Sequence, residues 1–149
     1  GVAELREMYD LRRILEEEAT RRACGRLDRE ALIALRAETE ALASRDGERL
    51  PLADALSVDS RLHETVAQGC GNRRLGREIG RYSILMETLW EIVGNNDTVR
   101  HGALQAHLRI IDALLAEDCP AAVAAMGAHM AEACRAAEGS LFLGTRGDS

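Results

Sequence analysis

Two side chains that suit metal binding share one face of a predicted helix. Asp59 and His63 are four residues apart, a spacing that stacks both side chains on the same side of a helix. Apolar residues such as Leu56 and Val66 fall near that same face. A buried carboxylate is costly unless it is paired or bound to a metal. The pair therefore indicates half of a metal site.

Two further histidines fall on the apolar stripes of later helices. His107 lies among leucines and isoleucines, and His129 lies on a stripe with Met126 and several alanines. A lone histidine on an apolar face is more often a core residue, but three of them beside a misplaced Asp59 favour a ligand set. Imidazole and carboxylate donors suit a divalent metal, and zinc, nickel and manganese are all compatible. The four donors leave room at an octahedral ion for water or an external carboxylate.

Two other residues are candidate contacts for a small ligand. Arg12 falls inside an apolar stripe that includes Met8, Leu11 and Leu15, where a guanidinium needs an anion. That anion is either an acidic side chain of the protein or the carboxylate of a bound ligand. Tyr82 lies on the apolar face of its helix, where its hydroxyl could line a pocket, although core packing is the commoner role.

Length and composition predict one all-helical domain. The chain has 149 residues, of which 46% are hydrophobic and 3% aromatic, with two prolines and no long β-branched run. The formal net charge of -6 argues against direct binding of nucleic acid by this domain. No stretch of about 20 residues is apolar throughout, as a membrane-spanning helix would require.

The cysteines and the start of the sequence favour a cytoplasmic protein. The four cysteines are widely spaced without a CxxC pair, so we expect reduced, partly buried thiols and neither a disulfide nor cysteine-metal binding. Residues 1–9 read as helix, and no signal peptide is evident.

Apolar periodicity and capping residues predict six helices joined by short loops. The expected ranges are 3–24, 28–44, 51–69, 72–93, 98–117 and 121–139. Short loops make sequential helices antiparallel neighbours, so the fold class is all-α, an antiparallel six-helix bundle with a central metal or ligand pocket. The folded domain is expected to span residues 1–143, and residues 144–149 to form a flexible tail.

The candidate ligands, taken as a set, resemble a known family. The order Asp59-x3-His63, then His107, then His129 is similar to the ligand pattern of the metal-binding FCD domain. The segment 9–16 resembles the opening helix of that family, including its arginine, and 71–75 and 107–114 resemble further family motifs. The resemblance covers residues 5–136.

The FCD domain is the C-terminal effector domain of FadR-type regulators in the GntR family. The resemblance therefore implies a sensor for a small organic acid, with Asp59, His63, His107 and His129 as metal ligands and Arg12 on the effector carboxylate. Six helices rather than seven are more similar to the VanR-type subgroup. A homodimer is implied, with DNA bound only through an N-terminal winged helix-turn-helix. That domain is expected to be absent from this chain, which begins at the effector domain.

Ligand-gated repression or activation is the function that follows, and two alternatives stay open. A metal-dependent, hydrolase-like enzyme would use the same metal and pocket. However, His63-Glu64 is followed by Ala67 where an HExxH motif needs its second histidine, and no Glu-x-x-His pair occurs. We therefore do not expect an enzyme. The other alternative is a purely structural helical module whose histidines pack in the core.

Overall fold

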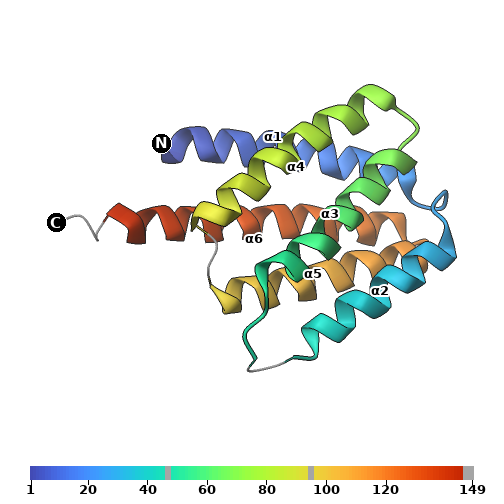
Figure 1. Cartoon of the computed structure of the whole chain (residues 1–149). Helices are drawn as coiled ribbons and strands as arrows, with labels where there is room; N and C mark the ends of the chain where they lie inside the picture. Colours follow the sequence, from blue (N-terminus) through green and yellow to red (C-terminus); the bar gives the residue numbers. More distant parts are fainter. Residues whose placement is uncertain (46–47, 94–95, 146–149) are drawn as a thin grey trace.

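The computed structural model describes residues 1–45, 48–93 and 96–145 of the chain. These residues form a bundle of six α-helices, and no strand occurs among them, which confirms the predicted all-α class (Figure 1). The helices are α1 (Val2–Ala23), α2 (Arg29–Ala43), α3 (Leu52–Gly69), α4 (Arg73–Val93), α5 (Asp97–Leu115) and α6 (Cys119–Thr145).

Side-chain caps explain why several helices begin where the sequence predicted. The Asp28 side chain accepts a hydrogen bond from the backbone N–H of Glu30 at the start of α2. The Asn72 side chain accepts from two backbone N–H groups at the start of α4. At α5 the cap is Asn96, so that helix begins one residue earlier than predicted. Gly71, with φ +75°, allows the tight turn between α3 and α4.

Helix α6 is longer than the sequence suggested. It continues to Thr145, past the expected end at Gly139, because its last turns pack against α1. Ala137 and Leu141 join a small apolar cluster with Leu5 and Tyr9 of α1. The expected tail therefore overlaps the helix at residues 144–145, and its residues 146–149 lie outside the described part of the chain.

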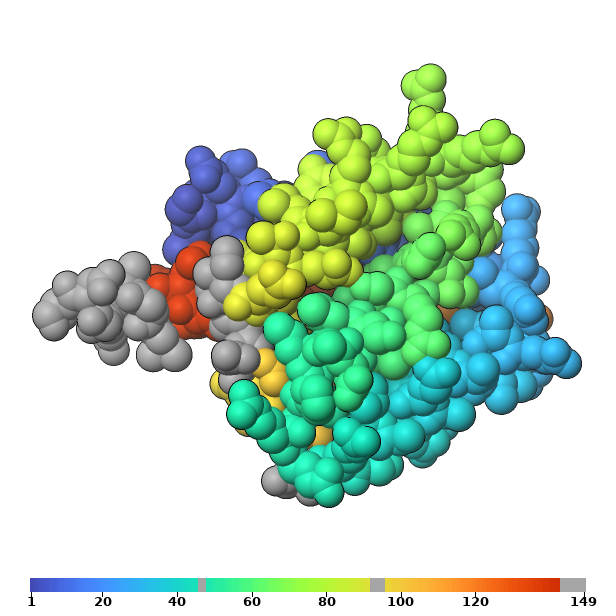
Figure 2. Space-filling view, viewed as in Figure 1, coloured from blue at the N-terminus to red at the C-terminus, as the bar shows by residue number. Residues whose placement is uncertain are grey.

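Helices α1 and α6 run side by side in opposite directions, and the other helices pack around them (Figure 1). Helix α5 lies against α6, α2 lies against α5, and α3 packs on both α1 and α4. From the side seen in Figure 2, α2, α3 and α4 cover most of α5 and α6. The main apolar core contains Leu62, Ile110, Ile111 and Met126, all fully buried. Of the described helices, none is both long and apolar enough to cross a membrane.

The buried face of α1 differs from the predicted stripe. Leu11 was expected in the core but is 42% exposed, whereas Tyr9, Arg12 and Glu16 are buried. The helix is rotated so that Arg12 and Glu16, rather than Leu11, face the centre of the bundle. The reason lies in what α1 meets there, namely a histidine of α3.

The prediction that all cysteines are reduced is wrong for one pair. Cys24, at the end of α1, forms a disulfide with Cys119, at the start of α6, and their Cα atoms are 5.6 Å apart. Cys70 and Cys134 are free thiols. The two bonded cysteines are far apart in the sequence, so only the side-by-side packing of α1 and α6 reveals the pairing.

Candidate metal centre

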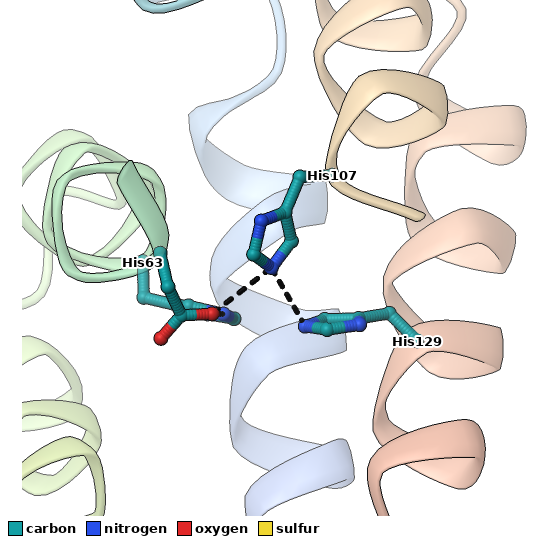
Figure 3. A group of neighbouring side chains, drawn as sticks. His63, His107 and His129 are labelled. Atoms are coloured by element: carbon teal, nitrogen blue, oxygen red, sulfur yellow. Dashed lines mark hydrogen bonds and ion pairs between the residues drawn. The ribbon is translucent and has the colours of Figure 1, made fainter. Parts of the chain in front are cut away.

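The four predicted ligands meet at one point inside the bundle. Asp59 and His63 come from α3, His107 from α5 and His129 from α6, and each offers a ligand atom within 4.8 Å of the others. Figure 3 shows the three histidine side chains pointing toward one another from their separate helices. This arrangement could hold a metal ion.

The distances between donor atoms fit the edges of a coordination polyhedron. Asp59 Oδ1 lies 2.9 Å from His107 Nε2 and 3.4 Å from His63 Nε2. The Nε2 atoms of His107 and His129 are 3.1 Å apart. Donors about 2.1 Å from one ion would lie about 3.0 Å apart in octahedral geometry and about 3.4 Å apart in tetrahedral geometry. These three distances are therefore compatible with donors around one divalent ion.

The cluster is buried, and two of its histidines titrate in opposite directions. Burial lowers the pKa of His63, but the carboxylates of Glu16 and Asp59 outweigh it and raise that pKa to about 9. Burial, together with the neighbouring His107 and His63, holds the pKa of His129 well below its usual value. Metal binding needs a neutral imidazole, so an ion entering the site at neutral pH would displace a proton from His63.

The pKa of Asp59 is set by its histidine neighbours. Burial alone would raise it, but the charge of His63 and a hydrogen bond from His107 hold it well below its usual range. The Asp59 side chain is about a quarter exposed, at 26%, whereas the three histidines are almost fully enclosed. Asp59 is therefore ionised, ready to act as a ligand, and is the ligand nearest to solvent.

Sequence reasoning missed one residue beside the cluster, Glu16 of α1. Its side chain is fully buried, and its Oε1 atom lies 2.9 Å from His63 Nδ1 and 3.6 Å from Arg12 Nε. Glu16 follows Arg12 by four residues, so both fall on the same helix face. That spacing is the signal that could have paired them.

Arg12 is buried, as its place in the stripe required, and the partner it contacts is Glu16. Of the two anions that the sequence left open, the structure supplies the acidic side chain. Arg12 nevertheless also lines a small cavity at the cluster. Tyr82 lies half-buried on α4 and is not among the residues that line the three cavities described below. Its role as a ligand contact stays a prediction.

Two small cavities adjoin the cluster on the side of α4 and α6. The inner one, of about 10 Å³, is lined in part by Arg12, Asp59 and His129. The outer one, of about 140 Å³, shares Trp90, His129 and Ala133 with it. The two cavities are therefore neighbours beside His129.

A larger groove, of about 780 Å³, lies on the other side of His63 between α3 and α4. Figure 2 shows these two helices next to each other on the surface. Arg73 and Arg77 line the groove near the α3–α4 turn, and Gly80 lines it farther along α4. Ser60 of α3 hydrogen-bonds Glu87 of α4 at 2.5 Å, and Glu87 borders both this groove and the inner cavity.

The structure is thus an all-α bundle with a buried cluster of three histidines and one aspartate. The model of the FCD domain family matches residues 7–132, most of the chain, and the chain belongs to that family. FCD domains are the C-terminal effector-binding domains of GntR-family regulators. The matched range contains all four cluster residues as well as Arg12 and Glu16. Among curated proteins, none matches the chain.

Proposed function

We propose that this domain is a metal-dependent sensor of a small organic acid in a GntR-type transcription regulator of the FadR subfamily, with the VanR-like arrangement of six helices. The observation that carries the proposal is the convergence of four donor atoms, from three helices, at spacings that match the coordination edges of one ion. Family membership supplies the regulatory context.

Asp59, His63, His107 and His129 would hold the ion. Imidazole and carboxylate donors suit zinc, nickel or manganese. A bound divalent ion would add positive charge beside the inner cavity. This charge would attract a carboxylate. Arg12, which borders the inner cavity, adds a second cationic group on the same side.

The size and lining of the two cavities favour a short acid. The outer cavity, of about 140 Å³, is far smaller than the roughly 300–1,000 Å³ of pockets for drug-sized ligands. Its walls include Trp90, Val99, Ala103 and Ala133, which suit an apolar body of a few carbon atoms. The inner cavity has room for about one water, so the carboxylate would lie at the boundary of the two cavities, beside His129 and on the side of Arg12.

The proposed signal arises because the effector contacts several helices at once. Arg12 belongs to α1, and the metal ligands belong to α3, α5 and α6. An acid that binds Arg12 and the ion together stabilises one arrangement of α1 relative to the other helices over an alternative arrangement. The free energy available for this shift is no more than the difference in the affinity of the acid for the two arrangements. In the regulator this shift would pass, through a homodimer, to an N-terminal DNA-binding domain.

The experiment that tests the proposal measures the metal content of the purified domain, prepared without a histidine tag. About one divalent ion per chain is expected in the wild type, and loss of that ion is expected in His107→Ala. The control is His101→Ala, which removes a histidine of the same helix outside the cluster and should leave the content unchanged. Metal-free wild-type protein, even after addition of zinc, nickel or manganese, would instead support the purely structural module.

The alternative of a hydrolase-like enzyme predicts a different result with the same samples. The FCD family belongs to regulators, which favours binding over turnover. A sensor binds the acid and returns it unchanged. Conversion of candidate acids or their esters by the metal-loaded wild type, absent in His107→Ala, would replace the sensor proposal with the enzyme.

A further inference from the structure

Glu16 is the buried charged group that the proposed function leaves unexplained. It lies on α1 with none of its side chain exposed. A buried carboxylate without partners is strongly unfavourable, and a buried ion pair is seldom more stable than apolar residues of the same size. Glu16 therefore needs a reason beyond the stability of the bundle.

The two nitrogens of His63 face two different carboxylates. Nδ1 lies 2.9 Å from Glu16 Oε1 on α1, and Nε2 lies 3.4 Å from Asp59 Oδ1 on its own helix. The Nε2 atom is the one on the cluster side, together with the Nε2 atoms of His107 and His129. Glu16 therefore contacts the nitrogen of His63 that is not on the cluster side, and it is not itself one of the four candidate ligands.

We infer that Glu16 is a positioning residue for the metal centre. Its carboxylate accepts a hydrogen bond from the Nδ1–H of His63 and so directs the lone pair of Nε2 toward the ion. This inference rests on the proposed metal function. Histidine ligands usually donate their second N–H to a carboxylate or a carbonyl, which fixes the ring and the tautomer and makes the ligand nitrogen more basic. The His63 Nδ1 and Glu16 Oε1 atoms are within hydrogen-bonding distance at 2.9 Å, although neither atom reaches full hydrogen-bond geometry with a described residue.

The surroundings of Glu16 suit this role. Its second neighbour is Arg12, whose Nε atom is 3.6 Å away and whose charge balances the carboxylate inside the bundle. His107, by contrast, has a buried Nδ1 atom with no hydrogen-bond partner among the described residues. Of these two histidines, only His63 has a carboxylate on its second nitrogen among the described residues, so the effect of Glu16 should act through His63.

The test compares Co²⁺ affinity and the visible absorption of bound Co²⁺ in three variants. Glu16→Gln keeps an acceptor oxygen of the same size and should weaken binding by about tenfold, and Glu16→Leu, which has no acceptor, by about a hundredfold. The absorption bands should shift in both, because one ligand is held differently. The matched control, Glu7→Gln, changes an exposed glutamate of the same helix and should match the wild type.

The outcomes separate this inference from the proposed function. If the wild type binds Co²⁺ and Glu16→Gln and Glu16→Leu bind it equally well with an unchanged spectrum, the inference is overturned and the metal site stands. If the wild type binds no metal, the proposed function itself fails. Circular dichroism shows whether each variant is folded. If Glu16→Leu does not fold, Glu16→Gln still decides the test, because glutamine has nearly the same size and shape as glutamate.

Discussion

Helix α3 has an apolar face and a polar face, offset by one residue in the sequence, that contribute oppositely to the stability of this domain. Val58, Leu62 and Val66 pack into the apolar core, with almost no exposed surface. Asp59 and His63 face the ligand cluster, where charged groups are held away from water. The apolar face stabilises the fold through burial, whereas the polar face is unfavourable until its groups are paired or bound to an ion. We therefore expect fold stability and the proposed sensing to depend on different sides of the same helix.

The largest effect should come from truncation on the apolar face. Leu62→Ala removes a fully buried side chain and should lower the free energy of unfolding by about 2–5 kcal/mol, from lost burial and the cavity left behind. Urea denaturation of the metal-free protein measures this change. Leu11→Ala, at a position that is 42% exposed, is the control and should change stability by less than about 1 kcal/mol. Equal effects at the two positions would show that burial of Leu62 is not what stabilises the fold.

The polar face should contribute more to stability when metal is present than when it is absent. An ion that binds the folded domain alone stabilises it by about 2.7 kcal/mol at a free concentration one hundred times its Kd. Thermal unfolding with zinc, and again after EDTA, should show this gain in the wild type. His107→Ala should unfold at the same temperature in both conditions. A gain of equal size in that variant would mean that the stabilising ion binds elsewhere.

The same comparison shows which parts of the domain the sequence predicts. Most helix ranges and the four candidate ligands follow from short-range spacing, because Asp59 and His63 share a face and His107 and His129 interrupt apolar stripes. Glu16 and the Cys24–Cys119 disulfide do not follow, since each depends on which distant helices touch. The exposure of Leu11 also depends on packing, because rotation of α1 by a fraction of a turn decides which residues face α3.

The metal-free protein should lose stability on both sides of about pH 6.5. The pKa of His63 is raised in the folded state to about 9, so its stabilising charge is fully present below about pH 6.5 and is lost as the pH rises through 9. The pKa of His129 is lowered in the folded state, so acidification below about pH 6.5 favours the unfolded chain, in which this imidazole binds a proton more readily.

Metal should remove the alkaline part of this dependence, because His63 is then a neutral ligand that has already released its proton. Urea midpoints between pH 5 and 9, with and without zinc, measure both profiles. Calorimetry in buffers of different ionisation enthalpy should also detect a proton released on metal binding near pH 7. Parallel profiles with and without zinc would show that His63 is not a ligand.

The smallest effect concerns the effector alone and separates the outer cavity from the metal site beside it. Gly102 lines that cavity on α5, and a Cβ atom added there meets nothing within 4 Å, so Gly102→Leu is expected to narrow the cavity while leaving the helix in place. With propionate as the probe, calorimetry on the zinc-loaded domain should show binding weakened by at least about tenfold, or about 1.4 kcal/mol, with metal content unchanged. Gly80→Leu is the control, because its added Cβ is equally unobstructed but lines the α3–α4 groove. If Gly80→Leu abolishes propionate binding and Gly102→Leu does not, the acid enters through the α3–α4 groove, past Ser60 and Glu87. The apolar side chains around Trp90 would then serve packing instead of binding the acid.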